Sequence, residues 1–453
     1  MSSKSLGTDL TSGHVGKQLI KFAIPFMFAN LLQTLYNMVD AVIVGQFVGA
    51  DGLSAVSSGG ELIQFYTFVA IGFGGAGQTL IGQFIGAGKR ERLNRTIGTL
   101  FSILLGMAII ISIFCAFTWN WQLSLIKLPE EAMKSGHDYF LICASGMIFI
   151  FGYNLVSSIL RGMGDSKHPL IFIAIASISN LVLDLLFVAG LHMGTAGAAL
   201  ATVMGQAISF IFALIYLYRN RQHFGFDFKL ESFRPDGSII SPLMRLGIPM
   251  SAQGALISIS MLYVYSLINA FGVAASAANG IQLKLANINR IVTNSMGTAG
   301  SAMIAQCIGA NKHDRAKSVF KWTMLVTLIY AALYSSCLIL FPKQIFSLFT
   351  HDQAVLAFAT LACLFSAGDN FGGAFRSPCN SMVNGTGAAI LGLVSSLMDG
   401  VIARIGLSIL FGNILGMGIS GYWLGNMLAG YVSVAILMPF VLSGAWRKKK
   451  LNI

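Results

Sequence analysis

GQFIGAGKRER (residues 82–92) follows one long apolar run of this sequence, and AQCIGANKHDR (305–315) follows another. Most of the eleven positions in the two stretches are identical or chemically similar. Upstream of each, AIPF (23–26) matches GIPM (247–250). A third matching pair lies near the end of each half: HMGTAGAALATVMGQ (192–206) and GMGISGYWLGNMLAG (416–430). The chain therefore contains an internal repeat of two consecutive halves.

The composition indicates a membrane protein. Of the 453 residues, 55% are hydrophobic and only 10% are charged, whereas roughly a quarter of the residues in soluble domains are charged. Apolar runs of about 20 residues recur along the chain, which is long enough for a helix to span a bilayer. Runs such as 104–119 and 170–190 do not alternate apolar with polar residues, which excludes the strands of an outer-membrane barrel.

We therefore predict an all-α integral membrane protein with twelve transmembrane helices in two parallel-repeat six-helix bundles. Six crossings are an even number, so both halves have the same orientation, and a transporter of this kind binds its substrate where the halves meet. The predicted domains are an amino-terminal lobe (1–218), a cytoplasmic linker (219–241) and a carboxy-terminal lobe (242–453). The predicted helices are 18–44, 54–85, 94–117, 136–158, 167–190, 195–218, 242–269, 275–306, 318–341, 353–380, 388–411 and 417–443.

Lysine and arginine determine the predicted orientation. Twenty-two of them lie on one side of the predicted spans and three on the other, which puts both termini in the cytoplasm. The net charge of +12 is spread over short loops, so it indicates topology and not binding to nucleic acid. Nothing points to a required protein partner. We expect a monomer in the lipid bilayer of a cell membrane, most simply in a prokaryote.

Five carboxylates fall within the predicted spans: Asp40, Glu61, Asp184, Asp369 and Asp399. An acidic residue at the centre of a spanning helix costs about 2.5–3.5 kcal/mol on insertion scales, so such residues usually face a cavity or a partner. Polar residues at helical spacing accompany three of the five acids. These stripes are Asn30, Gln33, Asn37 and Asp40 with Tyr36; Ser177, Asn180 and Asp184; Ser57, Glu61 and Gln64; a further pair is Thr202 and Gln206.

All of these stripes lie in the amino-terminal half, which predicts a hydrated or ion-binding chamber there. The alternative is that the polar groups join helices by hydrogen bonds, which are worth under 2 kcal/mol each. Asp40 and Asp184 favour the functional interpretation because a carboxylate is a costly way to join helices. In the second half, Lys284, Arg290, Arg376 and Arg404 are available to pair with Asp369 and Asp399. Asp399 precedes Arg404 by five residues, a poor match to an α-helical face.

The residues also argue against an enzyme. There is no H-E-x-x-H or G-x-S-x-G motif, and the seven histidines lie mainly in loops or at helix ends. The six cysteines form no C-x-x-C pair and are expected to pack as small apolar residues. We expect no catalytic residue, no cofactor and no metal beyond a possible Na+ at Asp40 and Asp184.

The order of several motifs resembles the multidrug and toxic compound extrusion (MATE) family over residues 15–445. The stretch 29–57 looks like that family's first helix and the loop after it, SILRGMGDSKHP (158–169) like the loop after helix four, and VNGTGA (383–388) like the loop after helix ten. The acids of the first half are similar to those of the DinF-like branch. Helix seven, 249–268, lacks the acidic residue of the NorM-like branch, which weakens a coupling site in the second half.

The resemblance implies a secondary antiporter that exports organic, mostly cationic and amphipathic compounds in exchange for H+ or Na+ by alternating access. Asp40 and Asp184 would couple the ion, and Pro25 would let the first helix bend. The other implied ion-coupling residues are Tyr36, Asn154, Asn180 and Thr202; the implied substrate chamber contains Asn37, Gln33, Glu61, Gln64, Asp369 and Gln282.

Three other functions remain open. A flippase of lipid-linked precursors needs cations in its cavity to hold a pyrophosphate, and Lys284 and Arg290 would serve that purpose. The acidic and neutral stripes of the first half argue against it. An intramembrane enzyme lacks a recognisable motif, and duplicated halves around a central site favour alternating access over a channel.

Overall fold

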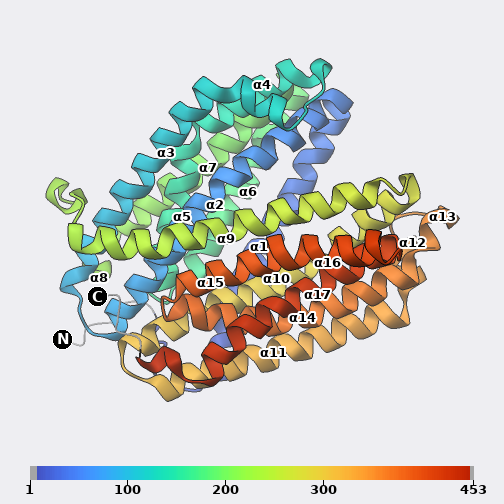
Figure 1. Ribbon diagram of the computed structural model, residues 1–453. Coiled ribbons are helices and arrows are strands. Elements are labelled where there is room, and N and C mark those ends of the chain that lie inside the picture. Colours follow the sequence, from blue (N-terminus) through green and yellow to red (C-terminus); the bar gives the residue numbers. More distant parts are fainter. Residues whose placement is uncertain (1–7, 449–453) are drawn as a thin grey trace. The chain divides into compact units, whose positions relative to one another are not determined.

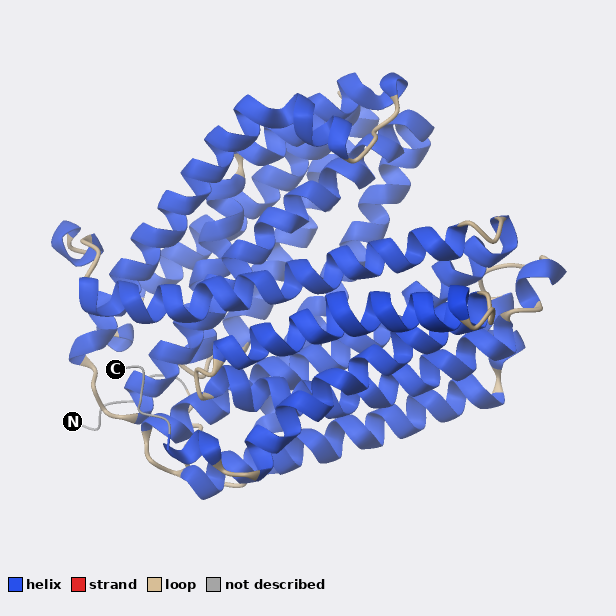
Figure 2. Ribbon diagram, viewed as in Figure 1, coloured by secondary structure: helices blue, strands red, loops and turns tan. Residues whose placement is uncertain are grey.

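Nearly all of the chain is helical. A computed structural model describes residues 8–448, and this part contains no strand (Figure 2). The first half comprises α1 (Val15–Phe47), α2 (Ala50–Gly86), α3 (Glu91–Leu125), α4 (Glu130–Ser145), α5 (Met147–Gly162), α6 (Lys167–Asp184), the π-helix η1 (Leu185–Gly190) and α7 (Gly194–Arg219). The short α8 (Arg221–Phe224) and the 3-10 helix η2 (Leu230–Phe233) follow before the second half begins.

The second half starts with α9 (Gly237–Asn269), α10 (Val273–Gly309) and α11 (His313–Leu340), followed by the short helices α12 (Pro342–Ser347) and α13 (Gln353–Leu356). The remaining elements are α14 (Ala359–Gly385), α15 (Ala389–Ser396), η3 (Leu397–Ile405), α16 (Gly406–Ile409), η4 (Leu410–Ile414), α17 (Ile419–Leu442) and η5 (Ala445–Lys448). The elements from α15 to η4 form one continuous span that alternates between α- and π-helix. In the same half α14 packs against α10, α11 and α17 (Figure 1).

These elements make the twelve predicted spans, so the prediction of an all-α membrane protein is confirmed. In the described part of the chain nine helical segments are long and apolar enough to cross a bilayer, and the α4–α5 pair makes a tenth. The other two spans are α10 and α14, which carry the charged residues Lys284, Arg290, Asp369 and Arg376. The two least apolar helices of the fold therefore pack against each other.

Two predicted helices were wrong in detail. The prediction of one helix over 136–158 fails because α4 and α5 meet at a 47° bend after Ser145. A Cβ atom on Gly146, at this bend, would lie 2.4 Å from Val203 Cγ2, so only glycine permits this approach to α7. The prediction over 353–380 combined the separate α13 with α14, which begins at Ala359 and continues to Gly385.

By packing, the described chain divides into two units. Unit 1 contains residues 8–9 and 24–251, and unit 2 contains 10–23 and 252–448. The predicted linker, 219–241, falls within unit 1, and the first turns of α1 belong to unit 2.

Side-chain contacts on two connecting segments explain this division. In unit 1, Thr99 Oγ1 of α3 accepts the Asp236 N–H at 3.0 Å, and Arg95 forms an ion pair with Asp236 at 3.3 Å. In unit 2, the Arg315 guanidinium donates to the carbonyls of Leu10 (3.0 Å), Ser12 (2.6 Å) and Gly13 (2.7 Å). Each segment is thereby attached to the unit that contains its partners.

Candidate functional site

Two acids of unit 1 form the core of the first candidate site. Asp40 lies on α1, and Asp184 is the last residue of α6, directly before the π-helix η1. Asp184 is completely buried, and the two carboxyl groups lie close enough to interact. Both oxygens of Asp184 and Oδ1 of Asp40 are buried without a hydrogen-bond donor among the described residues. These oxygens have lost water without gaining a donor.

The polar stripe of α6 continues this site. Asn180 lies one turn before Asp184, is only 4% exposed, and its Nδ2 has no acceptor in the described part of the chain. Ser177 Oγ and, on α7, Gln206 Oε1 are also buried and without partners among these residues. Buried polar groups in proteins are normally hydrogen-bonded. Their accumulation along one helix face therefore marks a site that takes a ligand.

Three tyrosines surround the acids. Tyr36 of α1 interacts with Gln33 and with both aspartates, and Tyr153 of α5 lies beside Tyr36. Tyr139 of α4 is 6% exposed and lies within electrostatic range of Asp40 and Tyr36. The sequence analysis missed Tyr139 as a site residue because its proximity to Asp40 depends on how α4 packs, and no local motif marks it.

The remaining predicted site residues of unit 1 are less enclosed. Asn154 Nδ2 donates to the Ile150 carbonyl at 2.8 Å, so its side-chain oxygen stays free to accept, and Thr202 is half-buried. Exposed positions are occupied by Asn37, Gln33, Glu61 and Gln64. Pro25 is buried within α1, which remains one helix from Val15 to Phe47.

The charge of the acid pair is not balanced by a nearby cation. The ion pairs found among residues 8–448 do not include Asp40 or Asp184. Arg161 of α5 instead donates to Gln78 Oε1 (3.0 Å) and Ser158 Oγ (2.6 Å). Within this range no cluster of three or more His, Cys, Asp or Glu residues has the arrangement of a metal site.

Unit 2 balances its central acid with two cations. Asp399 Oδ2 lies 3.0 Å from Arg376 Nη1, and Asp399 Oδ1 lies 2.8 Å from Arg404 Nη2. Arg404 also donates to Asn426 Oδ1. Asp399 and Arg404 are five residues apart, and they meet because both lie in the π-helix η3, whose repeat joins residues i and i+5. The sequence analysis treated this spacing as a poor match because it assumed an α-helix.

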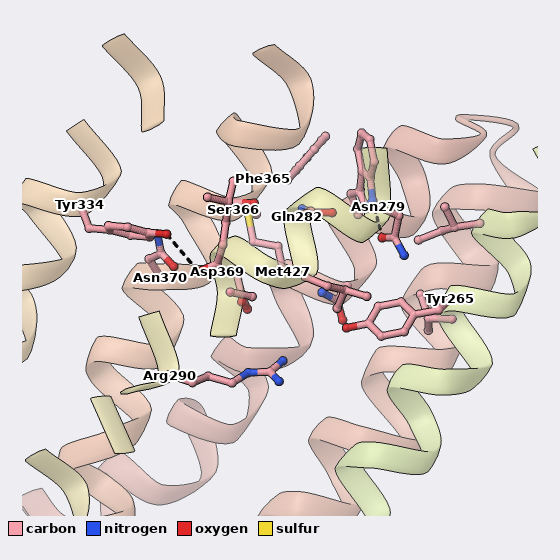
Figure 3. Close-up of a pocket in the computed structure, with 17 residues that line it drawn as sticks. Tyr265, Asn279, Gln282, Arg290, Tyr334, Phe365, Ser366, Asp369, Asn370 and Met427 are labelled. Atoms are coloured by element: carbon pink, nitrogen blue, oxygen red, sulfur yellow. Dashed lines mark hydrogen bonds between the residues drawn. The ribbon is translucent and has the colours of Figure 1, made fainter. Parts of the chain in front are cut away.

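A pocket opens beside this ion-pair cluster, entirely within unit 2. Figure 3 shows Asp369 and Gln282, two of the predicted chamber residues, on its wall together with Arg290 and Tyr265. These two predicted residues are thus brought together with each other, while the other predicted site residues belong to unit 1.

Comparison with known proteins establishes the family. The sequence model of the MatE family matches residues 25–186 and 249–410. The chain belongs to the MatE family. The two matches begin at Pro25 and Pro249, the prolines of the AIPF and GIPM pair, so the internal repeat is also the repeat of the MatE model.

Relatives of this MatE protein are named as multidrug resistance proteins. The probable multidrug resistance protein YoeA of Bacillus subtilis (strain 168) is 29% identical over 97% of this chain and 96% of its own length. The probable multidrug resistance protein YpnP of the same strain is 28% identical over 98% of each chain. A solved structure, described as the outward-facing conformation of a multidrug resistance MATE family transporter, is 22% identical with a TM-score of 0.91, covering 98% of this chain and 100% of its own. The protein is accordingly a multi-pass membrane transporter of the multidrug efflux type.

Proposed function

We propose that this MatE protein is a secondary antiporter that exports amphipathic organic cations in exchange for H+ or Na+. The observation that carries the proposal is the acid pair Asp40–Asp184, whose buried oxygens lack donors and whose charge lacks a cation among the described residues. Two carboxylates in contact in a medium of low polarity repel each other strongly. A bound proton or sodium ion relieves that repulsion.

The neighbouring groups suit either ion. A proton on one carboxyl would be shared with the other across their contact. A sodium ion would take oxygens from Asp184, Asn154 and Thr202, which Asn180 and Tyr36 help to position. Pro25, whose nitrogen cannot donate within α1, gives that helix a place to bend when the ion binds. The ion drives transport only to the extent that it binds one arrangement of the helix more tightly than the other.

Exposed polar residues of α1 and α2 provide the first contacts of a cationic substrate in this proposal. They are Asn37, Gln33, Glu61 and Gln64. The substrate competes with the coupling ion for the negative charge of the acid pair, which gives exchange without covalent chemistry. Both termini would face the cytoplasm, as the distribution of lysine and arginine indicates.

The flippase hypothesis has less support. A pyrophosphate group needs several free cations, but Arg376 and Arg404 are both engaged by Asp399. Lys284 lies 5.6 Å from the centre of the Phe349 ring and does not line the pocket. Arg290 is then the one cation on the pocket wall among the described residues.

Reconstitution in proteoliposomes tests the antiport proposal. Uptake of ethidium into inside-out vesicles would be driven by a pH gradient and by a Na+ gradient in separate experiments. We expect Asp40→Asn and Asp184→Asn each to reduce ion-driven transport at least tenfold, because an amide cannot exchange a proton and holds Na+ weakly. Glu131→Gln, which removes an exposed acid at the start of α4, serves as the matched control and should transport normally. The proposal is wrong if both aspartate variants keep full ion-driven transport.

A further inference from the structure

The pocket of unit 2 contains charges that the acid pair of unit 1 does not explain. Its wall is built by α9, α10, α11, α14 and α17, all of which belong to unit 2 over the lining residues. Two charged side chains reach it, Arg290 from α10 and Asp369 from α14 (Figure 3). Neither takes part in an ion pair found within residues 8–448. A guanidinium and a carboxylate thus share one pocket without neutralising each other.

Arg290 is oriented by neutral partners. Its Nη1 donates to Asn287 Oδ1 at 3.3 Å, and its Nη2 lies 3.3 Å from Met261 Sδ. These weak contacts hold the plane of the guanidinium and leave most of its five N–H groups free to donate. A guanidinium presents a planar fork of donors that matches a carboxylate.

The rest of the wall is polar at one level and aromatic at another. Ser366 Oγ is buried, with 6% of the residue exposed, and has no partner among the described residues. Asn370 Nδ2 reaches Ser335 Oγ only at 3.5 Å. Tyr265 and Trp423 supply aromatic surface on the same wall. The pocket therefore offers unsatisfied polar groups and a flat apolar body to a ligand, in addition to its two charges.

We propose that this pocket is a second binding site, for a small zwitterion with a carboxylate at one end and an ammonium group at the other. Arg290 holds the carboxylate, Asp369 holds the ammonium, and Tyr265 and Trp423 contact the apolar part between them. A zwitterion brings no net charge into the membrane, so it binds without a coupling ion to neutralise it. That such a ligand is also exported rests on the antiport function proposed above, whereas its binding does not.

Three compounds of one shape test this site in the purified full-length protein in lipid nanodiscs. They are the zwitterion 4-(aminomethyl)benzoate, the cation 4-methylbenzylamine and the anion 4-methylbenzoate, with binding measured by saturation-transfer NMR and calorimetry. We expect the zwitterion to bind at least tenfold more tightly than either singly charged compound. Arg290→Gln should reduce zwitterion affinity about tenfold and leave 4-methylbenzylamine unchanged. Asp369→Asn should reduce zwitterion affinity similarly and leave 4-methylbenzoate unchanged.

Lys284→Gln is the matched control, since Lys284 is a second cation of α10 that does not line the pocket. It should bind all three compounds as the unmodified protein does. Equal affinities for the three compounds, no measurable binding of the zwitterion, or an equal loss in the Lys284→Gln variant would each overturn the proposal. Ethidium transport in the same Arg290→Gln preparation shows that the variant is folded and tests the antiport function separately.

Discussion

The acidic centres of the two units differ more than their shared fold suggests. Pro25 and Pro249 are 224 residues apart, and so are Met193 and Met417 of the later matching pair. The same offset pairs Asp40 with Val264 and Asp184 with Ser408. Val264 is a fully buried member of an apolar cluster, and Ser408 donates to the Tyr422 carbonyl at 3.4 Å. Neither acid of unit 1 has an acidic counterpart in unit 2.

Unit 2 in turn has charges where unit 1 is neutral. Asn180, beside the acid pair, corresponds to Arg404, which binds Asp399. The repeat therefore preserved the glycines and prolines that the fold needs, while the charged positions changed independently in each half. Unit 1 has a pair of acids that needs an ion, and unit 2 has an acid that two arginines already satisfy. The two centres should respond in opposite ways when an acid is neutralised.

The largest effect is expected from Asp399→Asn. This change removes the anion from two arginines, of which Arg404 is only 1% exposed, and leaves buried guanidinium charges unpaired. Breaking a buried ion pair from one side costs about 3–5 kcal/mol. The apparent free energy of unfolding, measured by SDS titration in mixed micelles, should fall by that amount.

The exposed ion pair of unit 2 provides the control for Asp399→Asn. Asp314 lies 2.9 Å from Arg447 and is 95% exposed, so Asp314→Asn should leave stability nearly unchanged. If the two variants were equally stable, the arginines would be able to satisfy themselves without Asp399, and the contrast between the units would lose its energetic basis.

A smaller effect of opposite sign is expected from Asp184→Asn. In this case the substitution removes a buried charge that has no cation and no donor among the described residues. Stability should stay the same or rise by up to about 1 kcal/mol, because the desolvation cost of the charge disappears. The same SDS titration, done without Na+ at pH 8, measures it. A loss as large as that of Asp399→Asn would show that Asp184 is a structural group, even if transport also fails.

The sequence predicted the twelve helices because apolar length and glycine spacing are local properties. The helices predicted at 167–190 and 195–218, for example, lie at 167–190 and 194–219. The bend at Gly146 could not be predicted, because it depends on Val203 of α7, which packs there only in the folded chain. A glycine in a run of apolar residues has the same appearance whether or not a neighbouring helix approaches it.

The site was predicted in its acids but not in its pairing. Asp40 and Asp184 are noticeable in any apolar helix, because a carboxylate there is costly. The bond between Asp399 and Arg404 depends on the π-helix η3, and helical register is set by packing and not by a residue pattern. For the same reason the sequence could not separate Arg290, which is left without an anion, from Arg376 and Arg404, which share one.

The smallest effect compares the two connecting segments at low pH. Hydrogen bonds from the Ser232 hydroxyl and the Lys229 N–H hold the pKa of Asp227 below its usual value of about 3.8, and those from the Ser238 hydroxyl and N–H, with Arg95, do the same for Asp236. A lowered pKa stabilises the folded segment above the usual value, and this contribution is lost as the pH falls through the folded value. Residues 10–18 depend instead on the Arg315 guanidinium and neutral carbonyls, which do not titrate in this range.

Hydrogen exchange at pH 6 and pH 3, corrected for the intrinsic pH dependence of exchange, should therefore show residues 226–238 losing protection in acid while residues 10–18 keep theirs. The double variant Asp227→Asn, Asp236→Asn should exchange quickly at both pH values in the first segment. Arg315→Gln should do so in the second segment, again at both pH values, because the bonds it removes are insensitive to acid. Equal loss of protection in both segments of the unmodified protein at pH 3 would mean that acid acts on the whole fold, and the two segments would no longer differ in how they are held.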